Sequence, residues 1–384
     1  MNYSITPTEV VFSIDFSVGD LTLTEFNKVF DAFIQELKTI DYPINNLNVA
    51  VMNTGRLNDE EHGEDVFNDL SVINASLNVL SQTLVNLEER FVPHSLEMNF
   101  YSFEPIEDDK TSYISFVSGI FDFIGNLPNT SIVKKLSLNL QGLNLPEESS
   151  LYFTEDFLQR FPLLTTFTLD ANYIEDLSVD QIMIFIAQHN HLKSINIDIS
   201  VAQAENFDLR QVMLNKNLTS LEYKHTVLYP RSITNDEEIS EQFKCEYWEQ
   251  LGQCIKQHPN LKSFVYDVDT FDCEDSTDVH HAMINNFLHE IAYNRSLERL
   301  SVNIIEKDLN LYPSDEEQTE ITRQHYIKNS LIADINIRID GVKLKEKRSL
   351  CEPISTGGIF HQKKRDRSSY EGEGEHASLP DMKP

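Results

Sequence analysis

Cysteine, glycine, proline and cationic residues are all scarce in this chain of 384 residues. Its four cysteines include no CxxC pair, which argues against a disulfide framework and indicates reduced thiols in a cytosol-like compartment. The 12 glycines and 13 prolines disfavour a loop-rich all-β fold or a fibrous chain. Because 31 Lys and Arg stand against 62 Asp and Glu, the formal charge is −31, which argues against nucleic-acid binding, since phosphates require a basic face.

Long hydrophobic runs are also absent. The N-terminal segment has neither a basic stretch nor a continuous apolar stretch, so we expect no Sec-type signal peptide. No window approaches the length of apolar sequence that crosses a bilayer, so we expect no membrane span. The 40% hydrophobic and 24% charged residues are ordinary for a globular protein and exclude a wholly disordered one.

One short phrase recurs along the chain: an apolar residue, two polar residues, and then apolar residues in alternation. Alternation over four to six residues is typical of a short strand with one buried face. The run from Val10 to Phe16 alternates in the same way and predicts a strand that starts the array. Strong copies of the phrase begin at Val133, Leu164, Leu192, Leu218, Leu261 and Leu297, and weaker copies at Ile44, Pro93 and Ile332.

The segments between these phrases carry apolar residues at three- and four-residue spacing, which predicts amphipathic helices. Their ranges are 24–40, 65–91, 112–127, 178–190, 235–258, 276–294 and 314–328. Three of them open with a capping-box signature, at Ser178, Thr234 and Ser314. In the segment 235–258, the single tryptophan, Trp248, shares a face with Leu251 and Ile255, so we expect it in the core.

Strand and helix therefore alternate, and two α/β architectures compete. A doubly wound sheet would have strands in varied spatial order and a Gly-rich phosphate loop. A solenoid would repeat one phrase with consecutive strands side by side. The recurring phrase and the absence of GxGxxG or GxxxxGK[ST] favour the solenoid.

The phrase resembles the leucine-rich repeat LxxLxLxx(N/C)xL, which the segment from Leu164 to Ile174 matches along its whole length, including Asn172. Repeats of this length are similar to the ribonuclease-inhibitor-like subclass. The resemblance covers roughly residues 40–340 and implies a horseshoe, with parallel strands on the concave face and helices on the convex face. Other units lack the asparagine, which in the family bonds the backbone of neighbouring turns, and this departure predicts an irregular solenoid. The residues in its place are Gln141, Ser200, Thr226 and Asp269.

Three parts of the chain differ in pattern. Residues 1–130 hold degenerate repeats or a cap, residues 131–342 hold the leucine-rich repeats, and residues 343–384 form a disordered tail with little apolar periodicity. The basic cluster 363–367 is compatible with a nuclear-import address or with a solvated tail. The glutamates at 371, 373 and 375 resemble the C-terminal translocation signals of effectors that intracellular bacteria inject by type IV secretion.

Residues between the apolar anchors of each strand must point to the concave face, because neighbours along a strand face opposite ways. These residues are mainly Asp, Asn, Ser and Thr, which predicts an acidic and polar face for a partner with a basic or polar surface. The alternative is a solvated scaffold that binds its partner elsewhere. The predicted partner-binding residues are Asn139, Asp170, Asn196, Asp198, Glu222, Asp267 and Asn303.

Sequence motifs for catalysis are missing. The segment 272–281 has metal-ligand residue types but not the spacing of a zinc site, and the pair Asp267 and Asp269 lacks the glycine of a calcium loop. There is no GxSxG. We therefore expect a non-catalytic, monomeric scaffold without metal or cofactor, delivered by a bacterium into the host cytosol or nucleus, or else cytoplasmic. The alternative is a thiol- or metal-dependent enzyme with a site in the N-terminal region or near Cys273.

Overall fold

The computed structural model describes most of the chain up to Lys347. The described residues are 1–15, 22–52, 70–101, 110–140, 155–171, 179–199, 207–225, 241–270, 277–292, 294–306, 332–339 and 342–347. They belong to one compact unit, Met1–Arg348. Within it, no described helix is both long and apolar enough to cross a membrane.

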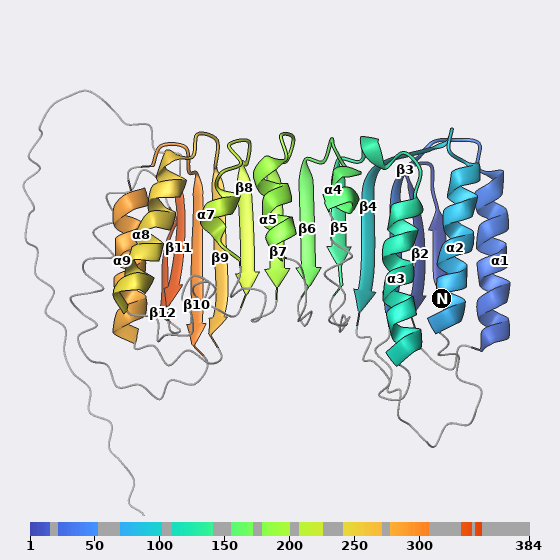
Figure 1. Cartoon of the computed structure of the whole chain (residues 1–384), viewed down its shortest axis with the longest axis horizontal. Coiled ribbons are helices and arrows are strands. Elements are labelled where there is room, and N and C mark those ends of the chain that lie inside the picture. Colours follow the sequence, from blue (N-terminus) through green and yellow to red (C-terminus); the bar gives the residue numbers. More distant parts are fainter. Residues whose placement is uncertain are drawn as a thin grey trace, which may run out of the picture. The chain divides into compact units, whose positions relative to one another are not determined.

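Twelve strands form a single sheet in which the spatial order follows the order along the chain (Figure 1). Neighbours from β2 to β11 are parallel, whereas β1 and β12 each pair antiparallel with the strand next to them. The α/β class is confirmed, but the expectation that all strands are parallel is wrong at both edges. The strands are β1 (Asn2–Ile5), β2 (Glu9–Asp15), β3 (Ile44–Met52), β4 (Phe91–Tyr101), β5 (Lys135–Asn139), β6 (Thr166–Ala171), β7 (Ser194–Ile199), β8 (Ser220–His225), β9 (Ser263–Thr270), β10 (Arg299–Glu306), β11 (Asp334–Ile339) and β12 (Val342–Lys347).

The helices lie on one face of this sheet (Figure 1). They are α1 (Leu23–Thr39), α2 (Leu70–Asn86), α3 (Lys110–Asn126), α4 (Glu155–Gln159), α5 (Val179–Gln188), α7 (Leu209–Val212), α8 (Glu241–Gln257) and α9 (Thr277–Ile291), with a 3-10 turn at Thr130–Ile132. The expected helix 314–328 and the capping signatures at Ser178, Thr234 and Ser314 lie outside the described residues. A capping box is instead present at Thr22 and Glu25, where each side chain bonds the backbone of the other and so satisfies free amides at the start of α1.

The core lies between the sheet and the helices. In β6, for example, Phe167, Leu169 and Ala171 are buried, and the burial pattern of the strand alternates along its length. Trp248 of α8 is fully buried and meets Tyr266 of β9 edge to face, with ring centroids 4.9 Å apart. Full burial of a large apolar side chain stabilises the fold by about 1.5–3 kcal/mol.

Register places the repeated phrase in equivalent positions on consecutive strands. The apolar residue that follows the two polar residues of the phrase forms a continuous row from β5 to β10: Leu136, Phe167, Ile195, Leu221, Phe264 and Leu300. Since side chains alternate along each strand, the residues between the buried ones must also line up in rows on the opposite face.

Side chains at the helix-to-strand turns tie neighbouring units together. We call His189, Asn215, His258 and Asn294 the bridging residues. His189 Nε2 donates to the Phe161 carbonyl at 2.9 Å, and Asn215 Nδ2 donates to the His189 carbonyl at 2.9 Å. His258 Nε2 then donates to the Asn215 carbonyl at 2.8 Å, and Asn294 Nδ2 donates to the Ile255 carbonyl at 3.0 Å.

Each bridging residue stands three positions before the leucine that precedes its strand, namely Leu192, Leu218, Leu261 or Leu297. The leucine-rich repeat predicts inter-unit bonds after the strand, at its asparagine. The bridging residues make further inter-unit bonds before the strand. Of the post-strand positions, Gln141, Asn172, Ser200 and Thr226 lie outside the described residues.

The sheet extends further toward the C-terminus than expected. Strand β12 pairs Lys343 with Arg338, Lys345 with Asn336 and Lys347 with Asp334. The predicted start of the tail at residue 343 is therefore too early, because backbone pairing continues to Lys347. Residues 349–384 form a second unit, which lies outside the described residues together with both of the charge clusters noted in the sequence.

Candidate functional site

The face of the sheet opposite the helices, which we call the open face, carries a continuous row of polar and charged residues. Register aligns six positions on neighbouring strands from β5 to β10, and we call them the charge row. Neighbouring strands lie about 4.8 Å apart, so each residue is adjacent to the next. The charge row consists of Asn139, Asp170, Asp198, Lys224, Asp267 and Asn303.

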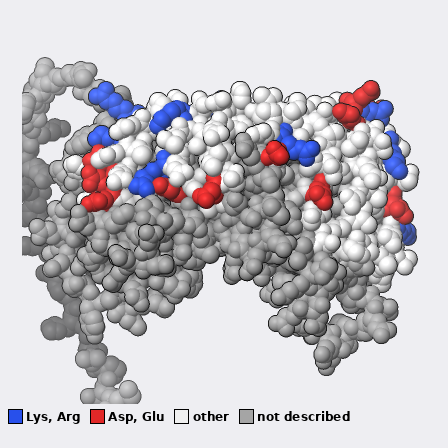
Figure 2. All heavy atoms as spheres, viewed as in Figure 1, with Lys and Arg blue, Asp and Glu red and all other residues white. Residues whose placement is uncertain are grey.

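Five of the seven predicted partner-binding residues thus stand in the charge row. The other two, Asn196 and Glu222, are partners of each other in the next row toward the strand starts, which also holds Thr168 and Ser301. All seven are partly exposed, as the alternation predicted. By contrast, Figure 2 shows the helix-covered face, on which the described acidic and basic side chains lie intermingled.

Lys224 is the member of the charge row that the sequence analysis did not include among the predicted site residues. It stands between Asp198 and Asp267, and its Nζ lies 2.9 Å from an oxygen of Glu222 on the same strand. The hydrogen bond to Glu222, together with the charges of Glu222, Asp198 and Asp267, raises the pKa of Lys224 against the opposing effect of burial. The ammonium therefore stays charged and neutralises part of this acidic face.

The remaining negative charge is concentrated at β6, β7 and β9. Asp170 and Asp198 are direct register partners, so two carboxylates stand next to each other on one side of Lys224. Like charges in directly opposed positions repel, so the pair would attract a cationic side chain of another protein. Carboxylates also accept two parallel bonds from a guanidinium, which makes arginine a fitting ligand for such a pair.

Amide side chains orient the face at its two flanks. Asn303 Nδ2 donates to Asp267 Oδ1 at 2.8 Å, which fixes the direction of that carboxylate. On the N-terminal flank, Asn99 donates to Asn48 at 3.3 Å and to Glu97 at 3.1 Å. Asn48, Glu97 and Asn99 are not among the predicted partner-binding residues, although they occupy the same alternate positions in the weaker copies of the phrase.

Candidates for chemistry are not brought together in the described part of the chain. Cys273 and the acidic residues beside it lie outside the described residues, as does Cys351. The described cysteines, Cys245 and Cys254, are not joined in a disulfide, and burial raises the pKa of Cys254, which disfavours the nucleophilic thiolate. Among the described residues there is no group of three or more His, Cys, Asp or Glu side chains that could hold a metal.

No protein-family model matches the chain, and no curated protein matches it either.

Proposed function

We propose that this chain is a non-catalytic protein-binding scaffold that holds a partner with a basic or polar surface on its open face. One observation carries the proposal: Asp170, Asp198 and Asp267 stand in a single row across neighbouring strands and are partly exposed. Short polar side chains leave a sheet face accessible to another protein, whereas large apolar side chains would require burial.

The proposal includes a leucine-rich-repeat solenoid of the ribonuclease-inhibitor-like kind, with the open face as the concave face of a horseshoe. Three observations support this assignment: strand order follows chain order, equivalent residues of the phrase share register, and the helices cover the opposite face. In such an array each unit contacts mainly its neighbours, so the face can be long without a central core.

The charges of the open face indicate what kind of partner surface it attracts. The charge row and Glu222 contribute four carboxylates and one ammonium, within a chain whose formal charge is −31. A partner with lysine or arginine side chains along one ridge would be attracted over a distance and would associate faster at low salt than at high salt. Complementary charges across an interface raise the encounter rate and fix the orientation of the partner, and like charges placed there weaken binding.

The charge of the row gives a direct test. The triple variant Asp170→Lys, Asp198→Lys and Asp267→Lys is expected to bind a basic partner at least about tenfold more weakly, because electrostatic attraction becomes repulsion. Lys224→Met is expected to strengthen the same interaction, since it removes the cation that competes with the partner. The measurement is quantitative affinity capture from eukaryotic cell lysate with the full chain, at low and moderate salt.

A matched control carries the same change in net charge on the helices. Asp31, Asp122 and Asp180 are exposed residues of α1, α3 and α5, and their replacement by lysine leaves the open face unaltered. Circular dichroism checks that all variants fold. Partners retained equally by the charge-row variant and by the control would move the binding site away from the open face.

We further propose that a bacterium delivers this protein into a host cell, in the cytosol or nucleus. The support is the resemblance of the glutamates 371, 373 and 375 to type IV translocation signals, together with the repeat-based scaffold. A translocation reporter fused to the full chain is expected to lose most of its signal when those glutamates become glutamine. Equal delivery of both fusions would contradict this assignment. A separate fluorescent fusion without residues 349–384 tests for a nuclear address in the tail, and a distribution between cytosol and nucleus equal to that of the full chain would exclude it.

A further inference from the structure

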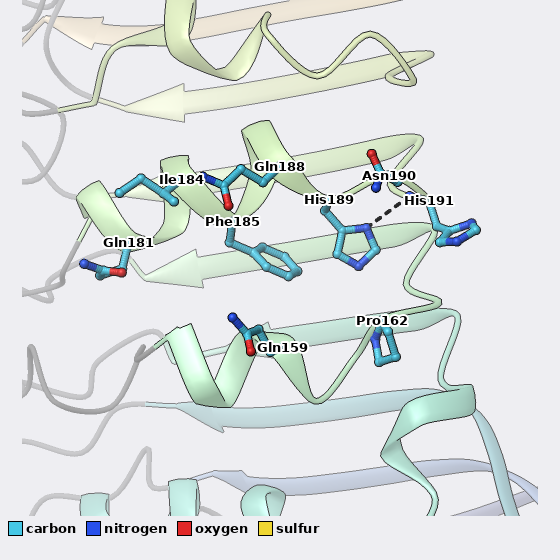
Figure 3. Close-up of a pocket in the computed structure, with 9 residues that line it drawn as sticks. All are labelled: Gln159, Pro162, Gln181, Ile184, Phe185, Gln188, His189, Asn190 and His191. Atoms are coloured by element: carbon cyan, nitrogen blue, oxygen red, sulfur yellow. Dashed lines mark hydrogen bonds between the residues drawn. The ribbon is translucent and has the colours of Figure 1, made fainter.

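A groove lies on the helix-covered face, between α4 and α5 (Figure 3). Its volume is about 360 Å³, which falls in the range of natural ligand sites. It is separate from the charge row, because α4 and α5 cover the face of the sheet opposite to the open face.

The floor of the groove is apolar. Phe185 of α5 packs edge to face on Phe167 of β6, with centroids 6.1 Å apart, and on His189, with centroids 4.9 Å apart. Ile184 is 40% exposed beside it, although it is a large aliphatic residue. Figure 3 shows Phe185 and His189 projecting toward the side of the groove that Gln159 and Pro162 form. An apolar floor with open access favours an apolar side chain of a ligand.

His189 closes one end of the groove as a neutral ring. Its Nε2 donates to the Phe161 carbonyl at 2.9 Å, and its Nδ1 accepts the His191 amide at 3.3 Å. Burial, the largest influence, lowers the pKa of His189, so the imidazole is uncharged near neutral pH. With both nitrogens engaged by the backbone, His189 serves as a wall of the groove and not as a base or a metal ligand.

The walls of the groove are polar and lack acidic, lysine and arginine side chains among the described residues. None of the nine described residues that line it is Asp, Glu, Lys or Arg, in a chain that is 24% charged. Gln181 and Gln188, two turns apart on α5, carry amide donors and acceptors, which is also what a peptide backbone offers. These residues offer a ligand apolar contact and amide hydrogen bonds but no Asp, Glu, Lys or Arg with which to form an ion pair, which favours an uncharged ligand.

We infer that this groove is a second binding site, for an extended and uncharged peptide segment of a partner protein. The amides would bond the backbone of the peptide, and one apolar side chain would lie on Phe185 and Ile184. The stretch of α5 from Gln181 to Gln188 rises about 10 Å, which matches about three extended residues. The inference goes beyond the proposed function, because it concerns the opposite face and a partner of different charge.

The test uses a phage-displayed library of random dodecapeptides, panned on the full chain. Enriched sequences are expected to share a short uncharged core with one apolar residue. Synthetic copies, followed by fluorescence anisotropy, should bind at least about tenfold more weakly to Ile184→Lys than to the wild type, because the lysine places a charge on the floor. Gln188→Glu, at an exposed position, provides a second block of the groove that leaves the core untouched.

Two controls separate the groove from other surfaces. Leu214 is 63% exposed and does not line the groove, so Leu214→Lys should leave peptide affinity within about twofold. The pair Asp170→Lys and Asp198→Lys should also leave it unchanged. The inference is overturned if no peptide is enriched, if the common core is charged, or if binding survives both groove variants. Peptides that respond to the charge-row variants alone would support the proposed function while overturning the groove.

Discussion

Replacement of Asn215 by leucine is expected to lower the free energy of unfolding by about 2–4 kcal/mol. Asn215 is 3% exposed, and its Nδ2 donates to the carbonyls of Ile186 and His189 at 2.7 and 2.9 Å. Its Oδ1 also accepts the amide of Asn217 at 3.0 Å. Leucine has a similar volume but can make none of these bonds, so buried backbone groups of two units would lose their partners. Urea denaturation followed by circular dichroism measures the change.

Asn217→Leu is the matched control, because Asn217 lies two residues away in the same turn and its side chain is exposed. We expect that variant to change stability by no more than about 0.5 kcal/mol. If both variants lost the same free energy of unfolding, replacement of any asparagine in this turn would be destabilising, and the loss could not be assigned to the inter-unit hydrogen bonds.

Stability is also expected to fall as the pH is lowered below about 6.5, through His258 and His189. Burial is the first cause that lowers the pKa of both rings from 6.5. His258 is 1% exposed, and its Nδ1 accepts the amides of Asn260 and Leu261 at 3.3 and 3.0 Å. Because the unfolded chain binds protons on these residues more readily than the folded chain, acid favours unfolding. Protonated His258 would lose two accepted bonds, a cost of about 1–3 kcal/mol.

His258→Asn separates this effect from the titration of the many carboxylates. Asparagine already fills the equivalent position at Asn215 and Asn294, where it bonds the preceding unit. The difference in unfolding free energy between variant and wild type, measured from pH 7.5 to 5.5, is expected to shift in favour of the variant as the pH falls. Parallel stability curves would show that His258 does not titrate within the fold.

The strand positions of the fold could be predicted from the sequence, because one buried face imposes alternation and the phrase repeats. The anchors Phe167, Ile195 and Leu221 align as predicted. The two edge strands gave no such signal. The expected repeats end before β12, and β1 has only four residues, with none of them buried. Helices α4 and α7, with five and four residues, are too short to show a helical period.

The bridging residues are a feature that the family pattern did not indicate. The leucine-rich repeat directs attention to the residue after the strand, where Asn172 lies outside the described residues, whereas His189 and His258 stand before the strand. His189 and His258 stand three residues before Leu192 and Leu261, and this spacing is visible in the sequence. Asparagines occupy the same place in the units of Leu218 and Leu297, however, and the two residue types look unrelated until their hydrogen bonds are seen. Only the three-dimensional arrangement shows that both reach the backbone of the preceding unit.

The sequence predicted which residues lie on the open face but not how their charges are arranged there. Alternation alone placed Asp170, Asp198 and Asp267 on one side of the sheet. How much negative charge Lys224 neutralises depends on which strands are its neighbours. It stands between Asp198 and Asp267, whereas a lysine at the end of the row would have one carboxylate beside it. The groove beside α5 could not be predicted, because Phe185 and Gln159 come from different units of the array.

The constant offset of the bridging residues also bears on how such a chain can diversify. The connections that lead from helix to strand share one offset in four consecutive units, from His189 before β7 to Asn294 before β10. A unit that keeps this histidine or asparagine can therefore bond the backbone of the unit before it. A lineage that gains or loses whole units, each with its own histidine or asparagine, would retain a stable architecture while acquiring a new specificity.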